Sequence, residues 1–184
     1  VRLGTNHESA VALVALGLAV ALRLALYWRG PLAPMGDMNM HCYLTALIVH
    51  ADGVPSSQRP LLPIDHFGAY PPAFHALAAL SSLVSSLSAA DSTRLWVALV
   101  FSLVTLALYT LLRLFFSPAP AALAAVLASF VPRQPQDQVG GGPVPTVLAL
   151  VFVILGLAQF LRWVSRPSVR TAAACGAFTA ASIL

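Results

Sequence analysis

Charged residues are scarce in this 184-residue chain: Asp, Glu, Lys and Arg make up only 9% of it, and lysine is absent. A soluble domain carries about 25% charged residues, so this composition excludes an ordinary soluble globular domain. Hydrophobic residues account for 59% of the chain, and the mean hydropathy is +0.84. We therefore expect an integral membrane protein.

Several motifs that would indicate other functions are also missing. The ten basic residues are arginines placed near the ends of apolar segments, without the interleaved aromatics of a nucleic-acid-binding stripe. Nucleic acid is therefore not an expected partner. Cys42 and Cys175 lack the CxxC spacing of a zinc or redox site. The glycines at 140–142 lack the context and the lysine of a phosphate-binding loop, so we expect a flexible turn there.

Long apolar stretches predict an all-α, polytopic transmembrane helical bundle, because a helix needs about 20 apolar residues to cross a bilayer. The spans are expected at about residues 9–28, 95–113, 118–131, 143–161 and 171–184. Arg23 lies close enough to the end of the first span to reach the interface. The last stretch is too short for a full crossing and the chain starts at Val1, so we expect a fragment of a longer protein.

The distribution of arginine predicts the orientation of the bundle. Arg162, Arg166 and Arg170 form the densest basic cluster, and the positive-inside rule places that loop in the cytoplasm. The acidic loops then lie on the non-cytoplasmic side of a membrane that we expect to be the plasma membrane, provided that the helix at about 72–90 does not cross. We therefore assign that helix to an external loop spanning residues 29–92, and we expect a second external loop at 132–142.

Residues 38–51 predict an amphipathic helix along the membrane surface. Its apolar positions recur with helical spacing: Met40, Tyr43, Leu44, Leu47, Ile48 and Ala51. Asp37, His41 and Thr45 fall on another line of the same helix. Asp37 stands at the N-terminus, where a carboxylate accepts backbone N–H bonds, and Asp52-Gly53 supplies a stop.

The order of these features resembles the N-terminal part of the GT-C superfamily over roughly residues 9–165. A first span is followed by Gly36-Asp37 opening an external helix, by Gly53-Val54-Pro55, and by Gly68-Ala69-Tyr70-Pro71-Pro72-Ala73-Phe74-His75 before the next apolar helix. Members of the superfamily are polytopic glycosyltransferases that use polyprenyl-phosphate-linked sugars. They include oligosaccharyltransferase catalytic subunits, protein O-mannosyltransferases and aminoarabinose transferases.

The resemblance implies that Asp37 is the catalytic base or a metal ligand near the acceptor. Asp137, in the second external loop, matches the second acidic residue, and Arg133 or Arg59 would bind the donor phosphate. A hard cation such as Mg²⁺ or Mn²⁺ would bind these carboxylates and neutralise the leaving phosphate. Because Asp137 has no acidic neighbour, a metal-independent reaction with Asp37 as base stays open, as does a solvated loop position for Asp137.

Other polar residues of the first loop are candidates for supporting roles. His41, one turn from Asp37, could orient the carboxylate or act as a ligand, or it could face water at the interface. The adjacent pair Asp65 and His66 could support the site. His75 lies on an apolar helix, either as a satisfied buried side chain or as a polar contact for the lipid carrier. Asp37 itself could be only a helix N-cap.

The leading hypothesis from the sequence is a glycosyltransferase that moves a sugar from a polyprenyl-phosphate-linked donor to an acceptor on the external face of the membrane. Its expected partners are the lipid-linked donor, membrane lipids and other membrane subunits. The alternative is a non-catalytic, GT-C-like or structural membrane subunit of a larger complex. A transporter is less favoured, because the spans show no central ionisable residue and no internal repeat.

Overall fold

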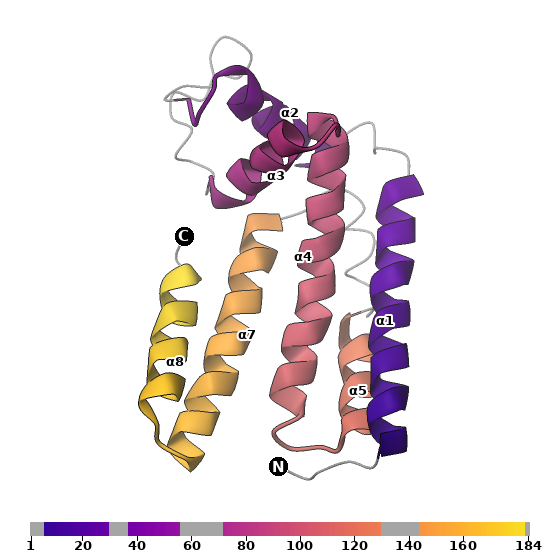
Figure 1. The fold of residues 1–184 in the computed structure, drawn as a ribbon, viewed down its shortest axis with the longest axis vertical. Helices are drawn as coiled ribbons and strands as arrows, with labels where there is room; N and C mark the ends of the chain where they lie inside the picture. Colours follow the sequence, from indigo (N-terminus) through magenta and orange to yellow (C-terminus); the bar gives the residue numbers. More distant parts are fainter. Residues whose placement is uncertain (1–5, 30–36, 56–71, 130–143, 183–184) are drawn as a thin grey trace.

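The computed structural model describes residues 6–29, 37–55, 72–129 and 144–182, and within these ranges the chain forms helices and no strand. The all-helical class expected from the sequence is confirmed (Figure 1). The seven helices are α1 (Asn6–Arg29), α2 (Asp37–His50), α3 (Ala73–Val84), α4 (Ala89–Leu112), α5 (Pro118–Ser129), α7 (Val144–Ser165) and α8 (Val169–Ala181).

Three of the described helices are long and apolar enough to cross a membrane: Asn6–Ala25 within α1, all of α4, and all of α7. They have 20, 24 and 22 residues. The helix α5, which falls in the third predicted span, is described over 12 residues. It rises about 18 Å, less than the roughly 30 Å of a bilayer's hydrocarbon core.

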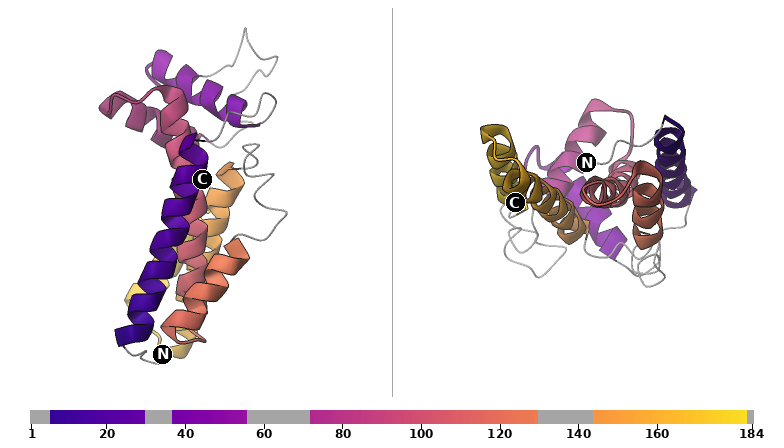
Figure 2. Two further views of the ribbon diagram at one scale, coloured as in Figure 1. Left: turned by 90° about the vertical axis from the view of Figure 1, so that its right-hand side faces the viewer. Right: turned by 90° about the horizontal axis from the view of Figure 1, so that it is seen from below.

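The helix α4 forms the centre of the bundle, with α1 and α5 on one side and α7 on the other (Figures 1 and 2). The helix α8 packs on the outer side of α7. At the N-terminal end of α4, α2 and α3 lie across the bundle beside each other, and we call this pair the α2–α3 layer. At the opposite end are the α4–α5 and α7–α8 turns, and we call it the arginine end. Its arginines are Arg113, Arg162, Arg166 and Arg170.

The start of α4 is determined by a capping arrangement at Ser88. The Ser88 Oγ accepts the Asp91 backbone N–H at 3.1 Å and donates to Asp91 Oδ2 at 2.7 Å. Such reciprocal bonding satisfies N–H groups that have no partner within the helix. The segment for which one helix was predicted, at about 72–90, is therefore divided: α3 ends at Val84 and α4 begins at Ala89.

The face that α2 buries differs from the predicted apolar stripe. The buried residues are Met38, His41, Leu44, Thr45 and Ile48, whereas Met40, Tyr43 and Leu47 are half-buried and Ala51 is exposed. The line with His41 and Thr45 faces inward because α3 and α4 offer imidazole and hydroxyl partners there. The helix ends as predicted at Asp52-Gly53: Asp52 has φ 51°, and the Gly53 N–H bonds the Ile48 carbonyl at 3.2 Å.

Arg23 does not reach the interface as predicted, because its side chain is buried with only 3% exposed. Its guanidinium donates to the Phe101 carbonyl of α4, and to the Ser129 carbonyl at the end of α5 at 2.5 Å. The last carbonyls of a helix have no intrahelical partner and favour a cation. Thr105 Oγ1 also donates to Ser129 Oγ at 2.8 Å. Arg23 thus joins α1, α4 and the C-terminus of α5 inside the bundle.

Candidate functional site

The α2–α3 layer contains the candidate residues whose side chains the structure describes, His41 and His75. Asp37 is the first residue of α2, but its side chain is outside the described part. The other predicted site residues also lie outside the described residues: Arg59, Asp65, His66, Arg133 and Asp137. The convergence of Asp37 and Asp137 on one cavity therefore stays a prediction.

His41 is paired with His75 of α3 inside the layer. The His41 Nδ1 lies 2.9 Å from the His75 Nε2, and neither side chain has any exposed surface. The two ring centroids are 5.1 Å apart, with the planes tilted by 33°. The alternative in which His41 faces water at the interface is therefore wrong. The alternative of a buried His75 is confirmed, and its partner is a residue 34 positions away in the sequence.

The hydrogen bond between the imidazoles limits their charge. One of the two facing nitrogens must carry the hydrogen while the other offers its lone pair. The pair keeps this bond when both rings are neutral or when one is an imidazolium, but not when both are protonated. The bond therefore joins α2 to α3 inside the layer.

Phe74 forms the wall between the histidine pair and the bundle. Its ring meets His41 edge-on at a centroid distance of 5.6 Å and His75 at 5.2 Å, with interplanar angles of 71° and 82°. The ring itself is 1% exposed and belongs to the largest hydrophobic cluster at the junction of α2, α3, α4 and α7. The pair therefore lies in an apolar setting, where a hydrogen bond is stronger than in water.

Hydroxyl groups connect the α2–α3 layer to the start of α4. Thr93 Oγ1 lies 2.9 Å from Thr45 Oγ1 of α2, and Ser92 Oγ donates to the Ala78 carbonyl of α3 at 2.6 Å. The indole N–H of Trp96 donates to Ser81 Oγ at 2.6 Å. Because each bond joins different helices, the layer has a defined position on the end of the bundle.

An apolar cavity of about 470 Å³ lies on the other side of Phe74. Its walls come from α3, α4 and α7 and from the C-terminal end of α8: Ala73, Phe74, Leu77, Trp96, Leu103, Pro145, Thr146, Leu148, Ala149, Phe152, Ala181 and Ser182. The volume is within the range of about 300–1,000 Å³ that small-molecule sites occupy. Its lining suits a hydrocarbon chain rather than a polar ligand.

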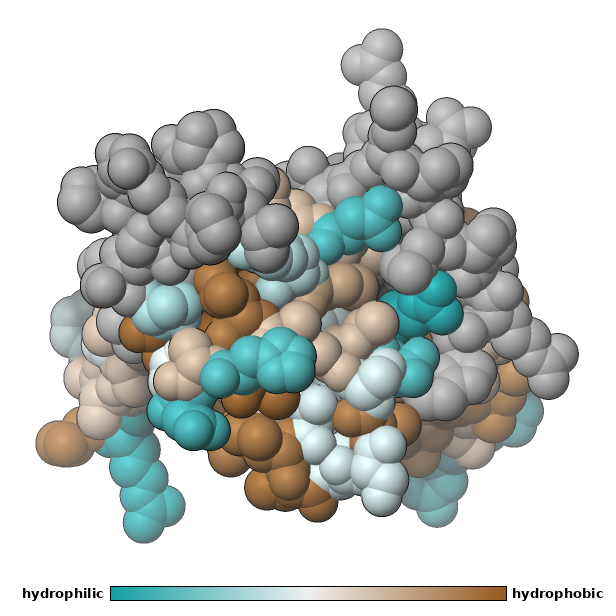
Figure 3. Space-filling view, turned by 90° about the horizontal axis from the view of Figure 1, so that it is seen from above, coloured by the Kyte–Doolittle hydropathy of each residue, from teal (hydrophilic) through white to brown (hydrophobic). Residues whose placement is uncertain are grey.

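The outer face of the layer is mixed in character. Seen from above, hydrophilic and hydrophobic side chains alternate over the described residues without one dominant patch (Figure 3). His50 and Asp52 are exposed polar residues at the end of α2, and Leu80 and Leu83 are exposed apolar residues of α3. A mixed face of this kind suits the boundary between headgroups and water.

The predicted ligands of Mg²⁺ or Mn²⁺, the carboxylates of Asp37 and Asp137, lie outside the described side chains, so the metal site stays a prediction. Within the described ranges no three His, Cys, Asp or Glu side chains come together in a way that could hold a metal ion. The imidazoles of His41 and His75 are nitrogen donors, which hard cations bind less well than carboxylate oxygens.

Sequence reasoning missed the partnership of His41 with His75 and the position of Phe74 between the pair and the cavity. One signal was available: His41 and Thr45 stand four residues apart, so they share a helix face. The pairing itself depends on how α3 returns over α2, and no residue pattern specifies that crossing.

The chain matches one family model, that of the family of unknown function DUF6541, over residues 3–184. No curated protein and no solved structure matches it.

Proposed function

The chain belongs to DUF6541, a family of unknown function, and we propose that this protein is a membrane glycosyltransferase of GT-C type. It would transfer a sugar from a polyprenyl-phosphate-linked donor to an acceptor outside the cytoplasm. The α2–α3 layer would face away from the cytoplasm, and the arginine end would face the cytoplasm of a cell whose plasma membrane holds the protein.

The observation that carries this proposal is the apolar cavity directly beneath the α2–α3 layer. It is bounded by Phe74, whose ring also touches the His41–His75 pair. A lipid-linked sugar has a hydrocarbon chain and a phosphorylated head, so its site needs an apolar hollow beside polar groups. The cavity would hold the hydrocarbon chain. The helix that begins at Asp37 packs against Phe74 through Met38, so Asp37 starts beside the cavity wall.

The chemistry of sugar transfer suggests the roles of Asp37, Asp137 and the two arginines. An acceptor hydroxyl oxygen would form a bond to the anomeric carbon of the sugar, while the bond from that carbon to the phosphate oxygen breaks. The electron pair stays with the polyprenyl phosphate. The hydroxyl proton would pass to the carboxylate of Asp37, a general base of ordinary type. Asp137 would organise the donor, and Arg133 or Arg59 would pair with its phosphate.

The test is Asp37→Asn in the full-length protein, assayed in membranes with a radiolabelled polyprenyl-phosphate sugar. We expect a loss of transfer of at least about 100-fold, because a general base contributes about 10²–10⁴-fold. Asp52→Asn is the matched control, since Asp52 is exposed just after the end of the same helix and its φ of 51° suits asparagine. Transfer that survives Asp37→Asn, or that falls equally in the control, contradicts the role.

The alternative of a non-catalytic subunit gains support from α8. It contains no buried residue, and it packs chiefly on α7. A helix of this kind can accept a neighbouring membrane subunit on its outer face. If Asp37→Asn leaves transfer intact but the protein co-purifies with a stoichiometric membrane partner, the subunit function replaces the enzymatic one.

A further inference from the structure

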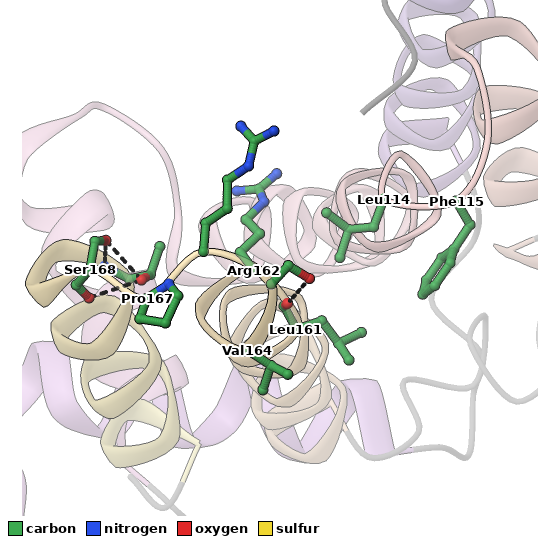
Figure 4. A pocket seen from close by; sticks show the side chains of 10 residues that line it. Leu114, Phe115, Leu161, Arg162, Val164, Pro167 and Ser168 are labelled. Carbon is green, nitrogen blue, oxygen red and sulfur yellow. Dashed lines mark hydrogen bonds between the residues drawn. The ribbon is translucent and has the colours of Figure 1, made fainter.

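A second hollow lies at the arginine end, between the α4–α5 turn and the α7–α8 turn. Its volume is about 690 Å³. The walls are formed by Leu114, Phe115, Leu161, Arg162, Val164, Ser165, Arg166, Pro167, Ser168 and Thr171. Figure 4 shows Arg162 at the end of α7, with two guanidinium groups directed to the same side. The helix ends that line the hollow lie at the opposite end of the bundle from the α2–α3 layer (Figure 1).

The charge of this hollow is uncompensated. Arg162 and Arg166 stand one helical turn apart, and no lining residue is acidic. Among the described residues neither side chain makes a hydrogen bond or an ion pair, whereas the nearby hydroxyls are already used. Ser165 donates to the Leu161 carbonyl at 2.9 Å, and Ser168 accepts the Thr171 N–H at 3.2 Å. The two guanidiniums therefore have donors available for an anion.

The other half of the lining is apolar. Leu114, Leu161 and Val164 contribute hydrocarbon, and Phe115 lies across the hollow from the arginines with 62% of its surface exposed. Trp163, next to Arg162, is also 40% exposed. Exposed aromatic side chains beside arginine at a helix end are typical of the membrane–water interface. An occupant must then combine an anionic head with an apolar body.

We propose that this hollow binds the phosphate headgroup of an anionic phospholipid from the adjacent leaflet, with Arg162 and Arg166 on the phosphate and the acyl chains along Val164 and Phe115. Basic hollows between helices at the membrane surface suit such headgroups, which are enriched in the cytoplasmic leaflet. The site stands independently of the proposed transferase activity. It would fix the α7–α8 turn relative to the α4–α5 turn.

Native mass spectrometry of the full chain in detergent micelles, titrated with phosphatidylglycerol or phosphatidylcholine, tests the site. We expect one tightly bound phosphatidylglycerol and no comparable phosphatidylcholine. Arg162→Gln and Arg166→Gln should each weaken binding about ten-fold, the effect of losing one charge-assisted hydrogen bond. Arg170→Gln is the matched control, because Arg170 is exposed at the same end but does not line the hollow. It should change binding less than about two-fold.

Three results would overturn the proposal. Arg170→Gln could weaken binding as much as the other two variants, which would show diffuse electrostatic attraction. Inorganic phosphate could bind as tightly as the lipid, which would show a site for a free anion. The chain could instead form a dimer that excludes the lipid from the hollow. Because both lining arginines are exposed, the variants should fold normally, and circular dichroism melting checks this.

Discussion

The two ends of the bundle use polar side chains in opposite ways. In the α2–α3 layer and at the start of α4, the side chains of His41, His75 and Thr93 are fully buried, and each is bonded to a named partner. At the arginine end, Arg162 and Arg166 are exposed and unpaired within the described ranges. A buried polar group costs free energy unless it is hydrogen-bonded. The helices must therefore pack so that the buried polar side chains keep their partners. The two exposed arginines contribute little to folding and leave their charge available to a ligand.

Replacing Arg23 should cause the largest loss of stability, because this arginine is buried and hydrogen-bonded, unlike those at the arginine end. Arg23→Met removes the donors for the Phe101 and Ser129 carbonyls. We expect a loss of about 3 kcal/mol in the free energy of unfolding, since hydrogen bonds to charged groups contribute about 1.5–3 kcal/mol. Arg170→Met, at an exposed position, should leave stability unchanged. Unfolding by sodium dodecyl sulfate in mixed micelles measures both, and equal stabilities would show that Arg23 does not join the helices.

The histidine pair should give the next largest effect. His41→Ala and His75→Ala each leave a buried imidazole without the bond seen at 2.9 Å. Each should cost about 2 kcal/mol, and the double variant should cost less than the sum of the two. His50→Ala, an exposed position on the same helix, is the control. A double-mutant cycle from chemical unfolding tests this, and strictly additive losses would argue against a direct interaction.

Replacing Thr93 should reduce stability less than replacing either histidine. Its hydroxyl has two acceptors within reach of its single hydrogen, the Ala89 carbonyl at 2.7 Å and Thr45 Oγ1 at 2.9 Å. Thr93→Val should cost about 1 kcal/mol, the usual contribution of one such bond. Thr110→Val is the matched control, because Thr110 bonds only the Leu106 carbonyl of its own helix. If the two variants lose equal stability in the same unfolding assay, the bond between α2 and α4 contributes nothing.

The sequence predicted the helical class and where most helices lie, because apolar runs and turn residues act locally. The stop after α2 at Asp52-Gly53 is an example: one residue with positive φ and one backbone bond end the helix. The serine-rich segment was harder, since the division between α3 and α4 depends on one side chain, Ser88, bonding back to Asp91. Local patterns identified the elements but not every boundary between them.

The candidate site was predicted less well, because its contacts join distant parts of the chain. The sequence singled out His41 by its position one turn from Asp37 but could not supply its partner on another helix. Arg23 shows the same limit: a basic residue near the end of a span is expected to reach the interface, but carbonyls of α4 and α5 accept its hydrogen bonds inside the bundle. Which polar side chains turn inward depends on what the neighbouring helices offer.

The smallest expected effect is on the reactivity of the Cys42 thiol in α2, which reports the charge in its immediate surroundings. Burial raises the pKa of its thiol, while the guanidinium of Arg94 partly lowers the same pKa. Because only the thiolate reacts with alkylating reagents, modification should be slow at pH 7 and should accelerate as the pH rises through the raised pKa. A Cys175→Ser background makes Cys42 the one remaining cysteine. The rate of iodoacetamide labelling, followed by mass spectrometry, reports the thiolate fraction.

Charge near Cys42 should matter, and charge at the other end should not. Arg94→Gln should slow labelling by no more than about five-fold, since a partly exposed charge pair contributes up to about 1 kcal/mol. Arg170→Gln should leave the rate unchanged, because α4, with its 24 residues, separates the two ends. That length is about 36 Å, several times the screening length of about 8 Å at physiological salt. If both variants slow the reaction equally, the two ends are not electrostatically independent, and the arginine end influences the α2–α3 layer.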